Sequence, residues 1–113
     1  MDATHRQSKL AEIGAAGQAR IAASTADVRL AGLAGAVCVR YLVGCGVGAL
    51  RVRDPRLIQV AQAASPSQIV VVIDDLPDER PPPLDLTDAV AREFAQGANE
   101  ALRLVRAMID LAR

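Results

Sequence analysis

The sequence predicts an α/β fold with a small three-stranded parallel sheet, and three observations support this. Short apolar segments at residues 27–31, 49–53 and 68–73 alternate with helix-like segments, and the connections between them are short. Such β-α-β-α-β alternation implies parallel strands joined by right-handed crossovers. Residues 87–112 carry apolar side chains at helical spacing, which predicts one long C-terminal helix. With 113 residues, the chain is expected to form a single domain, 1–113.

Glycine, proline and serine mark the boundaries between these elements. The expected order is a helical arm over residues 1–24, a turn at 24–26, a strand at 27–31, a glycine turn at 32–35, a helix to about 45, a second glycine turn at 46–48, a strand at 49–53, a helix to about 64, a strand at 68–73, a connector at 74–86 and the long helix at 87–112. Residues 27–73 thus form a predicted βαβαβ core.

Three of these elements have particular sequence support. Asp54 is a possible N-cap for the second crossover helix, with Pro55 at its first position. Residues 68–73, QIVVVI, form a β-branched run bounded by turn residues, which is typical of a strand. The connector at 74–86 is rich in proline and acidic residues, which predicts an extended surface segment.

The alternation of apolar and charged residues predicts how the sheet is covered. Leu50 and Val52 point to one face, and Arg51 and Arg53 point to the other; Arg29 breaks the first strand in the same way. Parallel strands that are covered on both faces are usually apolar throughout. We therefore expect helices on one face and a second face that is at least partly open to water or a partner.

Composition excludes several classes of function. Thirteen basic residues balance thirteen acidic ones, so no strong positive field attracts nucleic acid. No apolar run is long enough for a membrane span, and the polar first residues are not those of a signal peptide, so we expect a cytoplasmic protein without membrane contact. Cys38 and Cys45 are two turns apart on one predicted helix, too distant for a disulfide, and are interpreted as small buried residues.

A series of short motifs runs through the first half of the chain. The motifs are Arg6-Gln7, Gly17-Gln18, Gly32 and Gly35, Tyr41-Leu42, Gly46-Val47-Gly48, and Asp54 at the end of the second strand. Their order and spacing over about fifty residues resemble the start of the ThiF/MoeB/HesA family, relatives of the ubiquitin-activating enzymes with a Rossmann-like fold.

The resemblance implies a nucleotide site. The family binds ATP and adenylates the C-terminal carboxylate of a small carrier protein or peptide. By position, Gly32 and Gly35 would cradle phosphates at a helix N-terminus, Asp54 would hold the ribose hydroxyls, and Arg6 would reach the nucleotide of a dimer partner. Asp74 or Asp75 could stand in place of the family's metal-binding aspartate, which would make ATP with Mg²⁺ the implied ligand.

The chain also departs from the family pattern. Leu30 replaces the first glycine of the loop, Leu33 replaces an inner one, and no lysine follows Lys9. The family's phosphate-binding segment beyond Asp54 and its large substrate-binding half are missing. The chain is therefore identified as a truncated, degenerate relative.

Each candidate residue also has a plainer interpretation. Gly32 and Gly35 could serve only the tight turn and close helix packing, Asp54 could be only a helix cap, and Arg6 could be a solvated or interface charge. Asp74 and Asp75 could belong to a solvated loop.

The leading functional hypothesis is a non-catalytic interaction or scaffold protein. It would act as a homodimer, or as the accessory partner of a full-length ThiF-like adenylating enzyme or a small carrier protein. The alternative is a minimal ATP- or AMP-binding enzyme that activates a carboxylate. A third hypothesis is a stable fold whose role lies within a larger complex.

Overall fold

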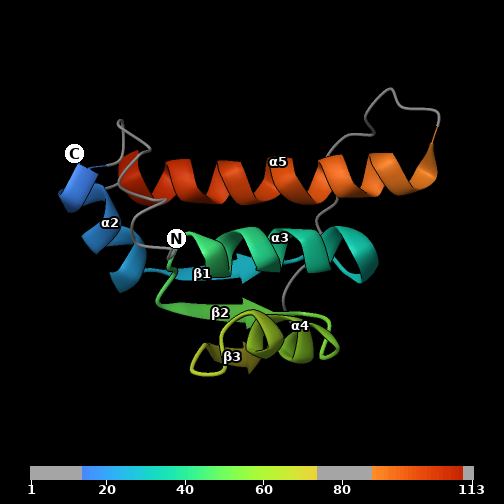
Figure 1. The fold of residues 1–113 in the computed structure, drawn as a ribbon, viewed down its shortest axis with the longest axis horizontal. Coiled ribbons are helices and arrows are strands. Elements are labelled where there is room, and N and C mark those ends of the chain that lie inside the picture. Colours follow the sequence, from blue (N-terminus) through green and yellow to red (C-terminus); the bar gives the residue numbers. More distant parts are fainter. Residues whose placement is uncertain (1–13, 74–87, 111–113) are drawn as a thin grey trace.

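Three parallel strands and four helices make up the described part of the chain, residues 14–73 and 88–110 of a computed structural model (Figure 1). The elements are α2 (Gly14–Ala23), β1 (Thr25–Val28), α3 (Gly32–Gly44), β2 (Ala49–Val52), α4 (Leu57–Ala64), β3 (Ile69–Val72) and α5 (Ala89–Asp110). This confirms the predicted α/β class, with its three-stranded parallel sheet and long C-terminal helix. The connector and the first half of the N-terminal arm lie outside the described residues.

The sheet has the strand order β1-β2-β3, and each neighbouring pair is parallel. Thr25 pairs with Ala49, and Ala49 pairs with Ile69, so the first residues of the three strands lie side by side in the sheet. The carboxyl ends of all three strands therefore meet at one edge of the sheet. In open parallel sheets this is the edge where ligands bind.

Helices cover one face of the sheet, as the alternation in the strands predicts. Leu50 and Val52 are fully buried, and with the neighbouring apolar side chains of α3 and α4 they form the core. On the opposite face, Arg51, Ile69 and Val71 are exposed. Within the described residues, this second face has no covering element.

The long helix α5 does not cover the open face but runs alongside α3 in the same direction (Figure 1). The two backbones approach very closely at Gly97. A Cβ atom at that position would lie 2.3 Å from the carbonyl oxygen of Ala34 and 2.8 Å from Cβ of Val37. Ala101 and Val105, one and two turns further along α5, are buried in the core.

Several predicted boundaries are wrong. Residues 32–35 belong to the first turn of α3 rather than to a turn before the helix. Thr25 and Ala26 belong to β1 rather than to a turn, because they pair with Ala49 and Leu50, and β1 ends at Val28 rather than residue 31. The helix α4 begins at Leu57, with Arg56 in the N-cap position, so Asp54 and Pro55 lie in the turn before it. Asp54 still organises this turn, since its main-chain carbonyl accepts a hydrogen bond from the Leu57 N–H at 3.0 Å.

Cys38 is buried as expected, whereas Cys45 is only half-buried. Both thiols are expected to react slowly in the folded protein. Burial, with Glu100 contributing, raises the pKa of Cys38 to about 12, and burial also raises the pKa of Cys45. At about pH 8, where an ordinary thiol is partly ionised, a disulfide reagent such as DTNB should react slowly with the native protein. It should modify both cysteines rapidly in concentrated guanidinium. Rapid modification of native Cys38 would contradict this packing.

Candidate functional site

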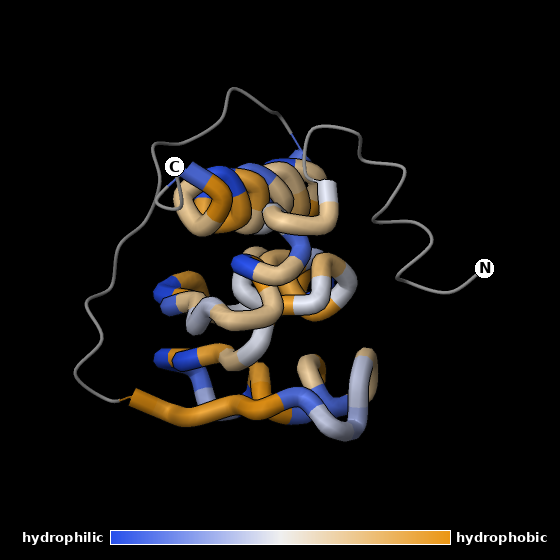
Figure 2. The backbone as a smooth tube through the Cα atoms, turned by 90° about the vertical axis from the view of Figure 1, so that its left-hand side faces the viewer, coloured by the Kyte–Doolittle hydropathy of each residue, from blue (hydrophilic) through white to orange (hydrophobic). Residues whose placement is uncertain are grey.

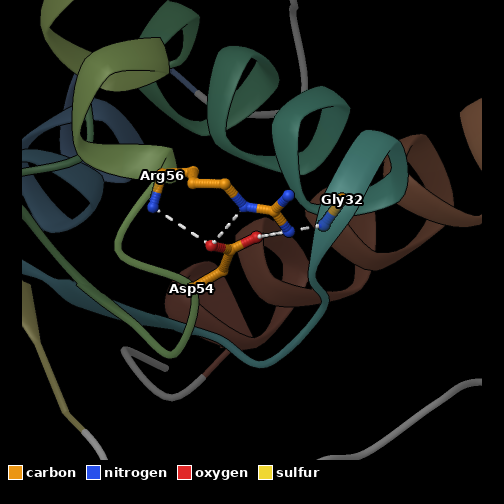
Figure 3. A network of polar contacts seen from close by, with 3 residues as sticks. All are labelled: Gly32, Asp54 and Arg56. Carbon is orange, nitrogen blue, oxygen red and sulfur yellow. Dashed lines mark hydrogen bonds and ion pairs between the residues drawn. The ribbon is translucent and has the colours of Figure 1, made fainter.

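The sheet topology brings Asp54 and Gly32 together, although they are distant in sequence. Asp54 follows the end of β2, and Gly32 begins α3, directly after β1 (Figure 3). The carboxylate oxygen Oδ2 of Asp54 accepts a hydrogen bond from the Gly32 N–H at 3.2 Å. This bond ties the second strand end to the first turn of α3.

Arg56 completes the surroundings of the Asp54 carboxylate. Oδ1 accepts hydrogen bonds from the Arg56 N–H and from its Nε, both at 3.0 Å. Oδ2 accepts a second hydrogen bond from Nη2 of Arg56, at 2.9 Å. Figure 3 shows the guanidinium folded back over the carboxylate, in the two-pronged geometry typical of strong arginine–carboxylate pairs. Each carboxylate oxygen thus accepts two hydrogen bonds.

These contacts keep Asp54 ionised. Hydrogen bonding to the Arg56 side chain is the largest effect on its pKa, which falls from 3.8 to about 2. Burial opposes this change, and the N–H groups of Gly32 and Arg56 add to it. Asp54 is 8% exposed and is the one charged or polar residue buried in the described part of the chain.

The two loop glycines have different structural roles. Gly32 adopts a positive φ of 62°, which favours glycine, and a Cβ there would meet nothing within 4 Å. Gly35 is buried, and a Cβ there would lie 2.4 Å from the carbonyl oxygen of Leu30. Close helix packing is therefore the structural requirement at Gly35.

The two leucines of this segment differ in exposure. Leu30 is buried, whereas Leu33 is 39% exposed. A phosphate loop needs backbone N–H groups that a ligand can approach, and glycine makes this approach possible. Leu30 has a side chain where the first glycine of such a loop has none.

A small cavity adjoins the N-terminus of α3. Its volume is about 250 Å³. Pockets for small molecules usually measure about 300–1,000 Å³, so this cavity lies below that range. Its lining combines the cation of Arg56 with the carboxylate of Glu93. The remaining lining residues are Leu30, Ala31, Gly32, Ala34 and Gln96.

The other predicted site residues are not part of this cluster. Arg6, Asp74 and Asp75 lie outside the described residues. Within residues 14–73 and 88–110, no group of three or more His, Cys, Asp or Glu side chains could hold a metal ion. Over the same ranges, no helix has the length and apolar character needed to cross a membrane.

Two arginines pair with aspartates in ways the sequence did not indicate. No motif in the sequence identifies Arg56 as a site residue, although an arginine two positions after a strand-end aspartate can reach back to it. On the open face, Arg51 makes two hydrogen bonds to Asp27, at 2.6 and 2.7 Å. That pairing, more than any other effect, lowers the pKa of Asp27.

The fold and this cluster define a Rossmann-like α/β protein with an internally paired aspartate at its strand ends. No protein-family model, no curated protein and no solved structure matches the chain. What the chain does is therefore inferred from its own residues and geometry.

Proposed function

We propose that the chain is a non-catalytic, ThiF/MoeB-like interaction or scaffold protein. It acts as a homodimer, or as the accessory partner of an active adenylating enzyme or a carrier protein. In this proposal the loop and strand-end aspartate of a nucleotide site survive as structural elements, and protein contacts supply the function.

The observation that supports this most strongly is the saturation of the Asp54 carboxylate. An ionised carboxylate has about four positions that can accept hydrogen bonds. At Asp54, two are taken on each oxygen by Gly32 and Arg56. Ribose hydroxyls would have to displace the Arg56 guanidinium to reach the Asp54 carboxylate. Asp54, which would bind the nucleotide in an active site, stabilises the turn instead.

The surroundings of Asp54 support the same proposal. Transfer of an adenylyl group requires positive groups that stabilise the charge developing on the phosphates, and each such group is worth about 3 kcal/mol of barrier. The cavity beside α3 is lined by Arg56, which is already paired with Asp54, and by Glu93. A carboxylate in that position repels a triphosphate.

The alternative, a minimal enzyme that binds ATP or AMP, is favoured by one feature of Arg56. Its side chain is 78% exposed, so it can leave the carboxylate without unpacking the core. A nucleotide that displaced it would find both Asp54 and the first turn of α3, whose N-cap residue Ala31 makes no side-chain hydrogen bond to that turn.

Calorimetric titration with nucleotide distinguishes between the two proposed functions. We expect ATP with Mg²⁺, and AMP, to bind the wild-type protein more weakly than about 1 mM, equivalent to less than about 4 kcal/mol of binding free energy. Light scattering of the same sample should show a dimer if the partner is a second copy.

Two variants give the titration its controls. Asp54→Asn removes the charge at the candidate site, while Asp110→Asn changes an exposed aspartate at the far end of α5. Micromolar nucleotide binding that Asp54→Asn abolishes and Asp110→Asn preserves would overturn the non-catalytic proposal in favour of the enzyme.

A further inference from the structure

The short strand β3 (Ile69–Val72) is an edge of the sheet in the described part of the chain. Figures 1 and 2 both place it on the side of the molecule opposite α5, and Figure 2 shows it as a continuous hydrophobic segment. Within the described residues it pairs with β2 alone. Its sequence, Ile69–Val72, contains no charge, proline or glycine. Exposed edge strands usually carry such residues because their unpaired backbone groups attract other strands.

The hydrogen-bond pattern shows which backbone groups of β3 face outward. The Ile73 N–H donates to the Val52 carbonyl oxygen at 2.9 Å, so the backbone of Ile73 faces β2. Backbone direction alternates along a strand. The N–H and C=O groups of Ile69 and Val71 therefore face β2 as well, and those of Val70 and Val72 face away from the sheet.

These outward groups are complementary to themselves under two-fold symmetry. In an antiparallel pair, residues directly opposite each other exchange both N–H···O=C bonds at alternate positions. If Val71 lies opposite Val71 of a second copy, Val70 lies opposite Val72 of that copy, and Val72 opposite its Val70. Every outward N–H and C=O group of the strand then has a partner.

The side chains are also compatible with a second copy. Ile69 and Val71 are 60% and 48% exposed on the open face, and in this register they form one apolar row with their counterparts. Nearest to this row on β2 lies Arg51, whose charge is balanced by its pairing with Asp27. No like charges are brought opposite each other, as a self-complementary interface requires.

We propose that β3 pairs antiparallel with β3 of a second copy, centred on Val71, and joins two sheets into one of six strands. This assignment rests on the homodimer included in the proposed function and names its interface. It leaves α5 of each copy on the side of the molecule opposite the interface, where it stays accessible to another partner.

Substitution at the symmetry axis tests the interface. Val71→Lys places two lysines directly opposite each other, so we expect the mass measured by light scattering to fall from that of two chains to that of one. Leu102→Lys is the matched control, since Leu102 is 49% exposed on α5, and it should leave the dimer intact. Circular dichroism checks that both variants keep their fold.

A cross-link tests the register without relying on dissociation. In a background with Cys45→Ser, Val71→Cys should form a disulfide-linked dimer, because opposed residues at such a position have Cα atoms about 4.5 Å apart. Ile69→Cys is more exposed but should not cross-link, since the two copies of residue 69 are about 13 Å apart along the strands.

Three outcomes would overturn the interface. They are a monomeric wild-type protein, a dimer that survives Val71→Lys, and cross-linking by Ile69→Cys that equals that by Val71→Cys. A dimer that survives Val71→Lys would exclude β3 as the interface but would leave the proposed function standing. Nucleotide binding would overturn the proposed function but would not change the results at the interface.

Discussion

Replacing Gly97 with alanine should destabilise the protein by about 3 kcal/mol. The added Cβ would lie 2.3 Å from the carbonyl oxygen of Ala34 and 3.1 Å from the backbone nitrogen of Cys38. Backbone atoms in a helix cannot turn aside as a flexible side chain can, so α5 must move away from α3. Overpacking of this kind usually costs about 1–3 kcal/mol, and the backbone contact places Gly97 at the upper end. Urea unfolding measures the loss as a lower midpoint.

Gly44→Ala is the matched control. Gly44 ends α3, and a Cβ there would meet nothing within 4 Å. Alanine is favoured over glycine in helices by up to about 1 kcal/mol, so this change should leave stability unchanged or raise it slightly. If both substitutions lowered the free energy of unfolding equally, the close contact at Gly97 would not be what makes α5 intolerant of a side chain there.

Replacing Asp54 with alanine should cost about 2 kcal/mol at neutral pH and should change the response to acid. The substitution leaves the Gly32 N–H without its acceptor and removes the ionic partner of Arg56. Hydrogen bonds to charged groups are typically worth about 1.5–3 kcal/mol. The exposed guanidinium regains water, so the loss stays within that range.

The direction of the Asp54 pKa shift determines how its contribution to stability changes with pH. Folding lowers the pKa of Asp54 from 3.8 to about 2, so the stabilisation is fully present above about 3.8. It is lost as the pH falls through about 2, when the folded protein also binds the proton. The stability difference between wild type and Asp54→Ala should therefore shrink between these pH values. A difference that stays constant down to pH 2 would mean that the carboxylate charge is not what stabilises the turn.

Much of the fold could be predicted because local patterns and sheet topology agree. The alternation Leu50-Arg51-Val52 gave both the strand and its buried face, and the β-branched run at 69–72 gave β3. The start of β1 was missed because Ser24 and Thr25 are ordinary turn residues. Pairing with Ala49, a tertiary contact, makes Thr25 part of the strand.

The sequence predicts where the candidate site lies, but not which contacts its residues make. Parallel strands place Asp54 beside Gly32, which the order of elements is sufficient to indicate. The role of Arg56 depends on how its side chain turns back after Pro55, and local sequence does not determine that. Gly35 is required because the backbone of Leu30 approaches it closely. A glycine that lets a phosphate approach the backbone and a glycine that lets another segment approach it cannot be distinguished in the sequence.

The close contact between α3 and α5 has a consequence for the order of folding. Asp27 and Arg51, on neighbouring strands, are 24 residues apart in sequence, so pairing β1 with β2 closes a moderate loop. The contact between Gly97 and Ala34 closes a much longer one, and the entropy lost on closing a loop rises with its length. The strands and their two crossover helices can therefore assemble first, and α5 adds last to a surface that is already formed.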